Sequence, residues 1–124
     1  MNAAGLCLFM YISLPDARVV TEFMRAVTGW DMSDEELITT GERIATIRHS
    51  FNLREGLNPL NYKIPGRSIG TPPLKEGPLT GVTVDEGTMI SEYLQAMNWD
   101  GQTTKPDKER LLELGLSNVA EALW

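Results

Sequence analysis

The chain has 124 residues, of which 42% are hydrophobic and 23% are charged, a composition ordinary for one soluble globular domain. Its formal net charge is −6, and its basic residues are scattered along the sequence. Nucleic acids and anionic membrane surfaces bind clustered lysines and arginines, so we expect neither as a partner.

Cysteine and histidine each occur once, as Cys7 and His49. A single cysteine excludes an intrachain disulfide, and it excludes a metal site built from four thiolates of this chain. The apolar run at residues 6–14 is shorter than the about 20 residues that a membrane-spanning helix needs, and it lacks the features of a signal peptide. We therefore expect a cytoplasmic protein without a membrane partner.

The hydrophobic pattern predicts an all-α fold, with a single helical domain over residues 1–124. We expect about five to six helices around one core and a long Pro/Gly-rich loop at about residues 57–82. Residues 3–13 are predicted to form a buried helix, which is favoured over a strand because the run does not alternate and has few β-branched residues. A helix that is apolar nearly all round should be covered on several sides.

Amphipathic patterns predict the next two helices at about residues 16–28 and 34–55. Ser33 and Glu36 have the spacing of a capping box, which opens the second of these helices. The residues expected on its inner stripe are Leu37, Gly41, Ile44 and Phe51.

Two members of this stripe are unusual. Gly41 costs a helix interior about 1 kcal/mol relative to alanine, which predicts that another backbone packs close to it. Arg48 falls in the same stripe, where a buried guanidinium would need an acidic or carbonyl partner. We favour the alternative, in which its stem packs and its charged group reaches solvent.

The Pro/Gly-rich loop is expected to wrap over a surface of this chain or of a neighbour. The side chains predicted to pin it are Leu60, Tyr62, Ile64, Ile69 and Leu74. Three shorter helices follow at about residues 85–98, 106–114 and 117–124, with Asp85 and Ser117 as predicted N-caps.

Composition and spacing alone indicate no chemistry. Cys7 in an apolar helix is most often a small buried hydrophobe, and no basic residue near it in sequence would activate its thiol. His49 lies off the apolar stripe and is predicted to be a surface residue, so a catalytic Cys7–His49 pair is disfavoured. The sequence has no Gly-rich phosphate loop and no metal-ligand spacing.

Six short segments are informative when they are taken together. They are residues 5–9 (GLCLF), 41–44 (GERI), 48–56 (RHSFNLREG), 64–67 (IPGR), 73–78 (PLKEGP) and 107–115 (DKERLLELG). This set resembles the C-terminal part of the aldehyde ferredoxin oxidoreductase family, whose members are tungsten enzymes with a bis-pterin cofactor and a [4Fe–4S] cluster. The likeness covers nearly the whole chain, and the combination of the first and third segments is its most specific feature.

The resemblance implies roles for four residues at the front of the chain. Cys7 corresponds to the fourth ligand of the iron–sulfur cluster, while Gly5 and Leu6 correspond to residues at the pterin. Asn2 stands where the best-known members have an aspartate that contacts the pterin, and it supplies no negative charge. The loop before Ile64 also lacks the family's acidic pair, which implies a divergent subgroup whose substrate need not be a simple aldehyde.

The cysteine count limits what this chain does by itself. A [4Fe–4S] cluster normally takes four thiolates, and this chain has one. We therefore expect a fragment, a split gene product or an isolated C-terminal domain that holds no cofactor and is inactive alone. The resemblance implies the N-terminal remainder of the enzyme as its partner. The complete enzyme would carry tungsten or molybdenum, oxidise an aldehyde to a carboxylic acid, and pass electrons to a ferredoxin-type acceptor.

Two alternatives stay open. In the first, the chain is a non-catalytic helical protein or orphan fragment that binds only a protein partner. In the second, it is a subunit of a benzoyl-CoA reductase type system. In any of these cases, loss of a covering surface would leave residues 3–13 partly exposed, which predicts homo-oligomers in solution.

Overall fold

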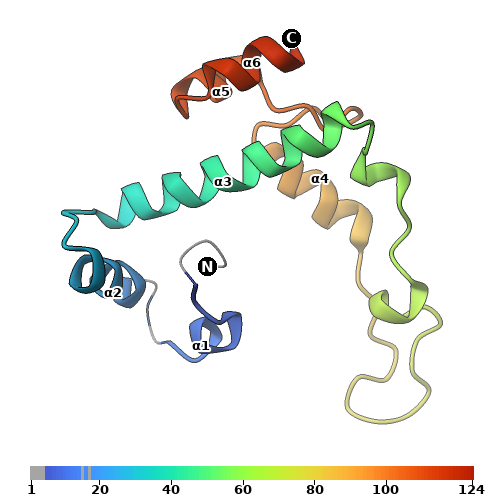
Figure 1. The fold of residues 1–124 in the computed structure, drawn as a ribbon. Helices are drawn as coiled ribbons and strands as arrows, with labels where there is room; N and C mark the ends of the chain where they lie inside the picture. Colours follow the sequence, from blue (N-terminus) through green and yellow to red (C-terminus); the bar gives the residue numbers. More distant parts are fainter. Residues whose placement is uncertain (1–4, 15, 17) are drawn as a thin grey trace. The chain divides into compact units, whose positions relative to one another are not determined.

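The computed structural model describes residues 5–14, 16 and 18–124. The chain divides into two compact units, Met1–Thr46 and Ile47–Trp124, which are described separately. The helices among the described residues are α1 (Leu8–Ile12), α2 (Arg18–Thr28), α3 (Asp34–Arg54), α4 (Glu86–Ala96), α5 (Lys108–Glu113) and α6 (Ser117–Leu123), with short 3-10 helices η2 (Pro59–Asn61) and η3 (Gly66–Ile69) (Figure 1). That part of the chain contains no β-strand, which confirms the all-α class.

The first unit differs from the prediction at its front. Residues 3 and 4 of the predicted 3–13 segment lie outside the described residues. In the remainder the helix is α1, and its Leu8, Phe9 and Ile12 side chains are 57%, 78% and 70% exposed. The expectation of a helix covered on several sides is therefore wrong for this chain, whereas the exposure of its described residues agrees with the expectation for a chain that lacks a covering surface. The physical reason is that the described part of the unit buries only Val20, Thr21 and Thr46, so it offers no apolar core against which α1 could pack.

Local signals define the ends of α2 and the start of α3. α2 ends where Gly29 takes a φ of 72° and its N–H donates to the Arg25 carbonyl at 2.9 Å. The capping box is confirmed, because the Glu36 N–H donates to Ser33 Oγ (3.1 Å) and the Ser33 N–H donates to Glu36 Oε2 (2.9 Å). These bonds satisfy backbone donors that an open helix end would leave free.

The predicted inner stripe of α3 is wrong for Gly41 and Phe51, which are exposed, whereas Leu37 and Ile44 are half-buried. The buried residues of α3 are Thr46 and Ser50, whereas Phe51 is 54% exposed and Arg48 is exposed, as favoured above. Among the described residues, a β-carbon added at Gly41 would meet nothing within 4 Å, so the predicted close backbone is not found there. The pattern failed because apolar residues occur all round α3, and contacts with distant parts of the chain decide which face is buried.

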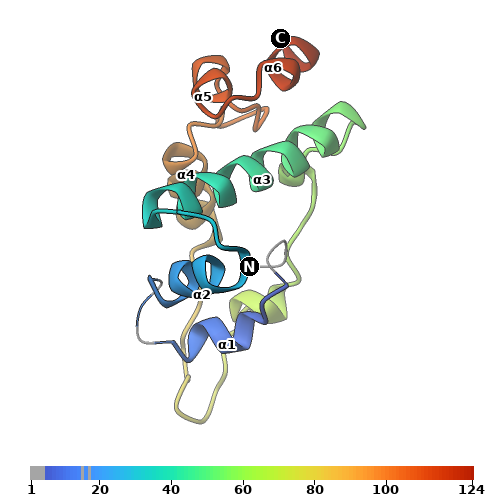
Figure 2. The ribbon, with the colours of Figure 1, turned by 60° about the vertical axis from the view of Figure 1, so that its left-hand side comes forward.

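The long loop of the second unit is closed by its own backbone. After η3 the chain turns back on itself and leads into α4 (Figure 2). The Val84 N–H donates to the Ile69 carbonyl at 2.9 Å, and the Gly81 N–H donates to the Leu74 carbonyl at 3.0 Å. Four of the five predicted pins, Leu60, Tyr62, Ile64 and Leu74, are exposed, and only Ile69 is half-buried. Backbone pairing, more than side-chain burial, shapes this loop.

The hydrophobic core of the second unit joins α5 and α6, which lie side by side (Figure 1). Its buried members are Leu111, Leu114, Leu116 and Ala120. Asp85 caps α4 as predicted, by accepting from the Thr88 N–H at 3.1 Å. Ser117 is not the cap of α6, because Leu116 occupies that position without a side-chain hydrogen bond. None of the described helices is both long enough and apolar enough to cross a membrane.

Candidate functional site

The predicted site residues lie at the start of the first unit. Gly5 is exposed with a φ of 70°, a left-handed conformation that favours glycine, and it turns the chain toward α1. Leu6 is half-buried and Cys7 is an exposed free thiol directly before α1. Asn2 lies outside the described residues. Adjacency in sequence keeps Gly5, Leu6 and Cys7 together, and the turn leaves the sulfur accessible.

The surroundings of Cys7 decide what it can bind. Residues 5–14 carry no charged side chain, and no group of three or more His, Cys, Asp or Glu residues comes together anywhere in the described chain. An iron–sulfur cluster takes four thiolates. One accessible sulfur fits the role of a single ligand to such a cluster, and it does not fit the role of a complete site.

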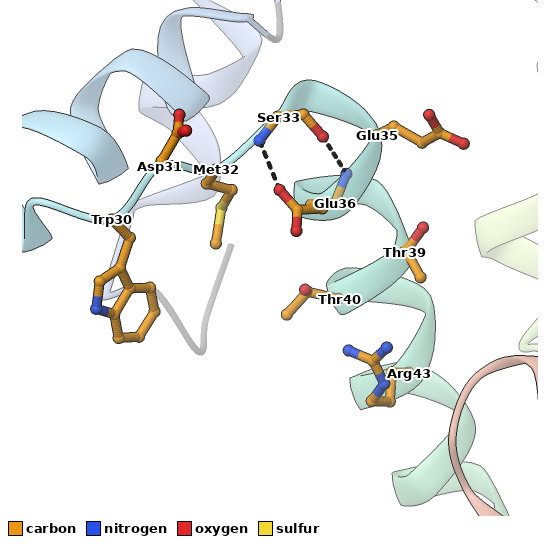
Figure 3. A pocket seen from close by; sticks show the side chains of 9 residues that line it. All are labelled: Trp30, Asp31, Met32, Ser33, Glu35, Glu36, Thr39, Thr40 and Arg43. Carbon is orange, nitrogen blue, oxygen red and sulfur yellow. Dashed lines mark hydrogen bonds between the residues drawn. The ribbon is translucent and has the colours of Figure 1, made fainter.

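A separate hollow of about 420 Å³ lies in the first unit between the α2–α3 connection and α3 (Figure 3). Its lining residues are Trp30, Asp31, Met32, Ser33, Glu35, Glu36, Thr39, Thr40 and Arg43. The described members of the predicted site, Gly5, Leu6 and Cys7, do not line it. The sequence did not indicate this hollow, although it places Trp30 three residues before the capping-box Ser33. The exposure of Trp30 is known only from the structure.

The prediction of His49 as a surface residue is wrong. Its imidazole is half-buried and stacks on the indole of Trp99, with ring centroids 3.9 Å apart. His49 Nε2 lies 2.8 Å from the Thr104 carbonyl oxygen, which can only accept, so Nε2 carries the proton and donates it. Trp99 is fifty residues away in sequence, so no local pattern indicated this contact. His49 is engaged in holding the second unit together.

The described residues therefore form an all-α protein with one exposed free thiol ahead of a short apolar helix. The model of a known family, "Aldehyde ferredoxin oxidoreductase, domains 2 & 3", matches residues 1–116. The chain belongs to the aldehyde ferredoxin oxidoreductase family.

Curated relatives agree with this assignment. The chain is 36% identical over 116 residues to a "Tungsten-containing aldehyde ferredoxin oxidoreductase" of Pyrococcus abyssi, and 35% identical over 116 residues to one of Pyrococcus horikoshii. It is 33% identical over 117 residues to the protein of that name from Thermococcus kodakarensis. Each match covers 94% of this chain and 19% of the relative, so the chain spans about a fifth of their length. No solved structure gives a significant match.

Proposed function

We propose that this chain supplies one part of the cofactor housing of a tungsten-pterin, iron–sulfur oxidoreductase and is inactive without the rest of that enzyme. Cys7 would be one of four thiolate ligands of a [4Fe–4S] cluster. Asn2, Gly5 and Leu6 would form part of the wall of the pterin pocket. The complete enzyme would oxidise an aldehyde to a carboxylic acid and deliver electrons to a ferredoxin-type acceptor.

The observation that carries this proposal is the exposed thiol of Cys7. A lone cysteine in an apolar run is usually buried, because its side chain behaves as a small hydrophobe. Here the only cysteine of the chain is exposed in front of a short helix, within the segment that matches the family. A sulfur held in this way can reach a ligand that lies outside the chain.

The residues around Cys7 suit a cluster ligand in three respects. Gly5 has no side chain, so its turn allows a close approach of a bulky cofactor to the backbone. Leu6 presents an apolar surface beside the sulfur. The lack of charge over residues 5–14 keeps the site apolar, which is one of the protein's means of setting a cluster potential. When bound, the pterin metal would supply two-electron chemistry and the cluster would carry single electrons away.

A chimaera tests the proposal. In the Pyrococcus abyssi relative, the 116 matched residues would be replaced by the corresponding residues of this chain, and the protein would be produced anaerobically. We expect the chimaera to contain one [4Fe–4S] cluster, measured by iron and sulfide analysis and by the electron paramagnetic resonance of the reduced state. Cys7→Ser should lower cluster occupancy or change the spectrum, whereas the matched control Ser13→Ala should change neither.

The chain produced alone under the same conditions should bind no stoichiometric iron or tungsten. A complete cluster in the isolated chain would overturn the proposal, and so would a chimaera whose cluster content and spectrum are indifferent to Cys7→Ser. The second result would favour the alternative of a helical protein that binds only a protein partner.

A further inference from the structure

We propose that the Pro/Gly-rich loop of the second unit binds an aliphatic monocarboxylate. The carboxylate would pair with Arg67, and the hydrocarbon chain would lie in an apolar hollow formed by residues 67–84, which we call the loop hollow. This proposal concerns a different segment from Cys7 and does not depend on the proposed function.

The loop hollow has the size and lining of a small-molecule site. Its volume is about 690 Å³, within the range of roughly 300–1,000 Å³ that is typical of ligand pockets. Its apolar lining consists of Ile69, Pro72, Leu74, Leu79, Val82 and Val84. Four of these side chains, Leu74, Leu79, Val82 and Val84, are exposed to solvent. A hydrocarbon chain in the hollow would remove them from water, which the hydrophobic effect favours.

The backbone of the loop holds the two sides of the hollow close together. The segment after η3 turns back before it enters α4 (Figure 1), and the Val84 N–H donates to the Ile69 carbonyl oxygen at 2.9 Å. A β-carbon added at Gly70 would lie 2.4 Å from the Val82 carbonyl oxygen, so the two sides meet at a distance that only glycine allows. The hollow is therefore formed before a ligand arrives, and binding does not have to order the loop.

The charge of the loop selects an anion. The basic residues of segment 57–82 are Lys63, Arg67 and Lys75, and its acidic residue is Glu76, so the segment has a net charge of +2 in a chain of net charge −6. Among the described residues that line the loop hollow, only Arg67 is charged. Arg67 is exposed and forms no ion pair with any described residue. Its guanidinium has parallel N–H donors that match the two oxygens of a carboxylate.

The rest of the lining narrows the class of the ligand. The other polar side chains of the hollow are those of Ser68 and Thr71, whose hydroxyls donate as well as accept. The described lining includes no aromatic side chain and no acidic group, so it favours neither a stacked ring nor a cation. One guanidinium offsets the lost hydration of one negative charge, and a second negative charge would stay unpaired. These features together fit an aliphatic chain that ends in a single carboxylate.

Titration of the isotope-labelled full chain with sodium octanoate at neutral pH tests the site, with backbone amide NMR as the readout. We expect saturable shifts at Ile69, Gly70 and Val82. Hexanoate should bind between about fourfold and about 15-fold more weakly, because it lacks two methylenes and each fully buried methylene contributes about fourfold in affinity. Octylammonium has the same chain with the opposite charge, and it should not cause these shifts.

Variants test the two halves of the site separately. Arg67→Gln should weaken octanoate binding at least about tenfold, since it removes the hydrogen bonds of a charged pair. Leu79→Ser should also weaken it, by exposing part of the apolar wall. Arg48→Gln is the matched control, because Arg48 is an exposed arginine of α3 that does not line the hollow. All three substitutions are at exposed positions, and the amide spectrum without ligand checks that each variant keeps its fold.

Octanoate that causes no shifts at residues 67–84 would overturn the proposal. Octylammonium that causes the same shifts would also overturn it, because the hollow would then adsorb any hydrocarbon chain without recognising the carboxylate. Equal octanoate binding by Arg67→Gln and Arg48→Gln would have the same meaning. The comparison of octanoate with octylammonium uses the unchanged chain, so it decides the question even if a substitution alters the fold.

Discussion

The imidazole of His49 lies flat on the indole of Trp99, with ring centroids 3.9 Å apart and an angle of 7° between the ring planes. Tyr93 meets the same indole edge-on at 5.8 Å. His49 also donates from Nε2 to the Thr104 carbonyl oxygen at 2.8 Å. One side chain of α3 thus connects the helix to both ends of the turn that follows α4.

His49→Ala should destabilise the second unit. The substitution removes a stacked aromatic pair, which contributes about 0.5–1.5 kcal/mol, and a hydrogen bond, which contributes about 0.5–1.5 kcal/mol. We expect the free energy of unfolding to fall by about 1–3 kcal/mol. Urea unfolding followed by tryptophan fluorescence and by circular dichroism measures this change.

His49→Phe separates the two contributions, because it keeps a ring against Trp99 and removes only the Nε2 donor. Its loss of stability should lie between those of the unchanged chain and His49→Ala. Arg48→Ala is the matched control, since Arg48 is exposed one residue away on the same helix. A His49→Ala chain as stable as the control would show that the stacking contributes nothing.

The turn after α4 should lose stability in acid. The pKa of the Asp100 carboxyl lies below its ordinary value of 3.8, chiefly because the Thr103 N–H donates to it, followed by the Thr103 hydroxyl and the Gln102 N–H. A carboxyl whose pKa is lowered by folding stabilises the folded chain above its unfolded pKa, near 3.8. That stabilisation is lost as the pH falls through the lower pKa of the folded state.

The stabilisation by the Asp100 carboxylate can be tested by comparing the thermal unfolding of Asp100→Asn with that of the unchanged chain over a series of pH values. The unchanged chain should be the more stable at pH 6, and the difference should shrink as the pH falls below about 3.8. Glu76→Gln changes the same formal charge at an exposed loop position and serves as control. A difference between Asp100→Asn and the unchanged chain that stays constant down to pH 2 would mean that the carboxylate charge has no part in holding the turn.

Features that depend on neighbouring residues were predictable from the sequence. The Ser33–Glu36 capping box and the Asp85 cap were expected, and both occur, since each needs only residues three positions apart. The partners of His49 were not predictable, because Trp99 and Thr104 become its neighbours only after the chain has folded. The buried face of α3 was missed for the same reason, as the residues it buries are the polar Thr46 and Ser50.

The candidate site shows a different limit. Gly5, Leu6 and Cys7 could be named from a short motif, and the structure adds that the Cys7 thiol is exposed. Sequence alone favoured a buried thiol, because apolar neighbours usually imply a core. Burial depends on what a helix packs against, and the described part of the first unit buries only Val20, Thr21 and Thr46.

Helix α5 should tolerate substitutions only on its exposed side, away from the α5–α6 core. Leu111 is completely buried in this core, whereas its neighbour Leu112 is 53% exposed. Leu111→Ala should lower the free energy of unfolding by about 2–5 kcal/mol, through lost burial and the cavity that remains. Leu112→Ala removes the same atoms from an exposed position and should change it by less than about 0.5 kcal/mol. Equal effects in urea unfolding would mean that α5 does not bury its Leu111 side against α6.

The isolated chain should self-associate through α1. Leu8, Phe9 and Ile12 leave an apolar face in contact with water, and pairing such faces removes that contact. Light scattering should give a mass above the 13.8 kDa of one chain, increasing with concentration. Phe9→Ser/Ile12→Ser should shift the mass toward a monomer, whereas Leu112→Ser, an equally polar change at an exposed leucine of α5, should not. A monomeric mass at high concentration would show that this face does not drive association by itself. An oligomeric mass that is the same for the double variant would show the same.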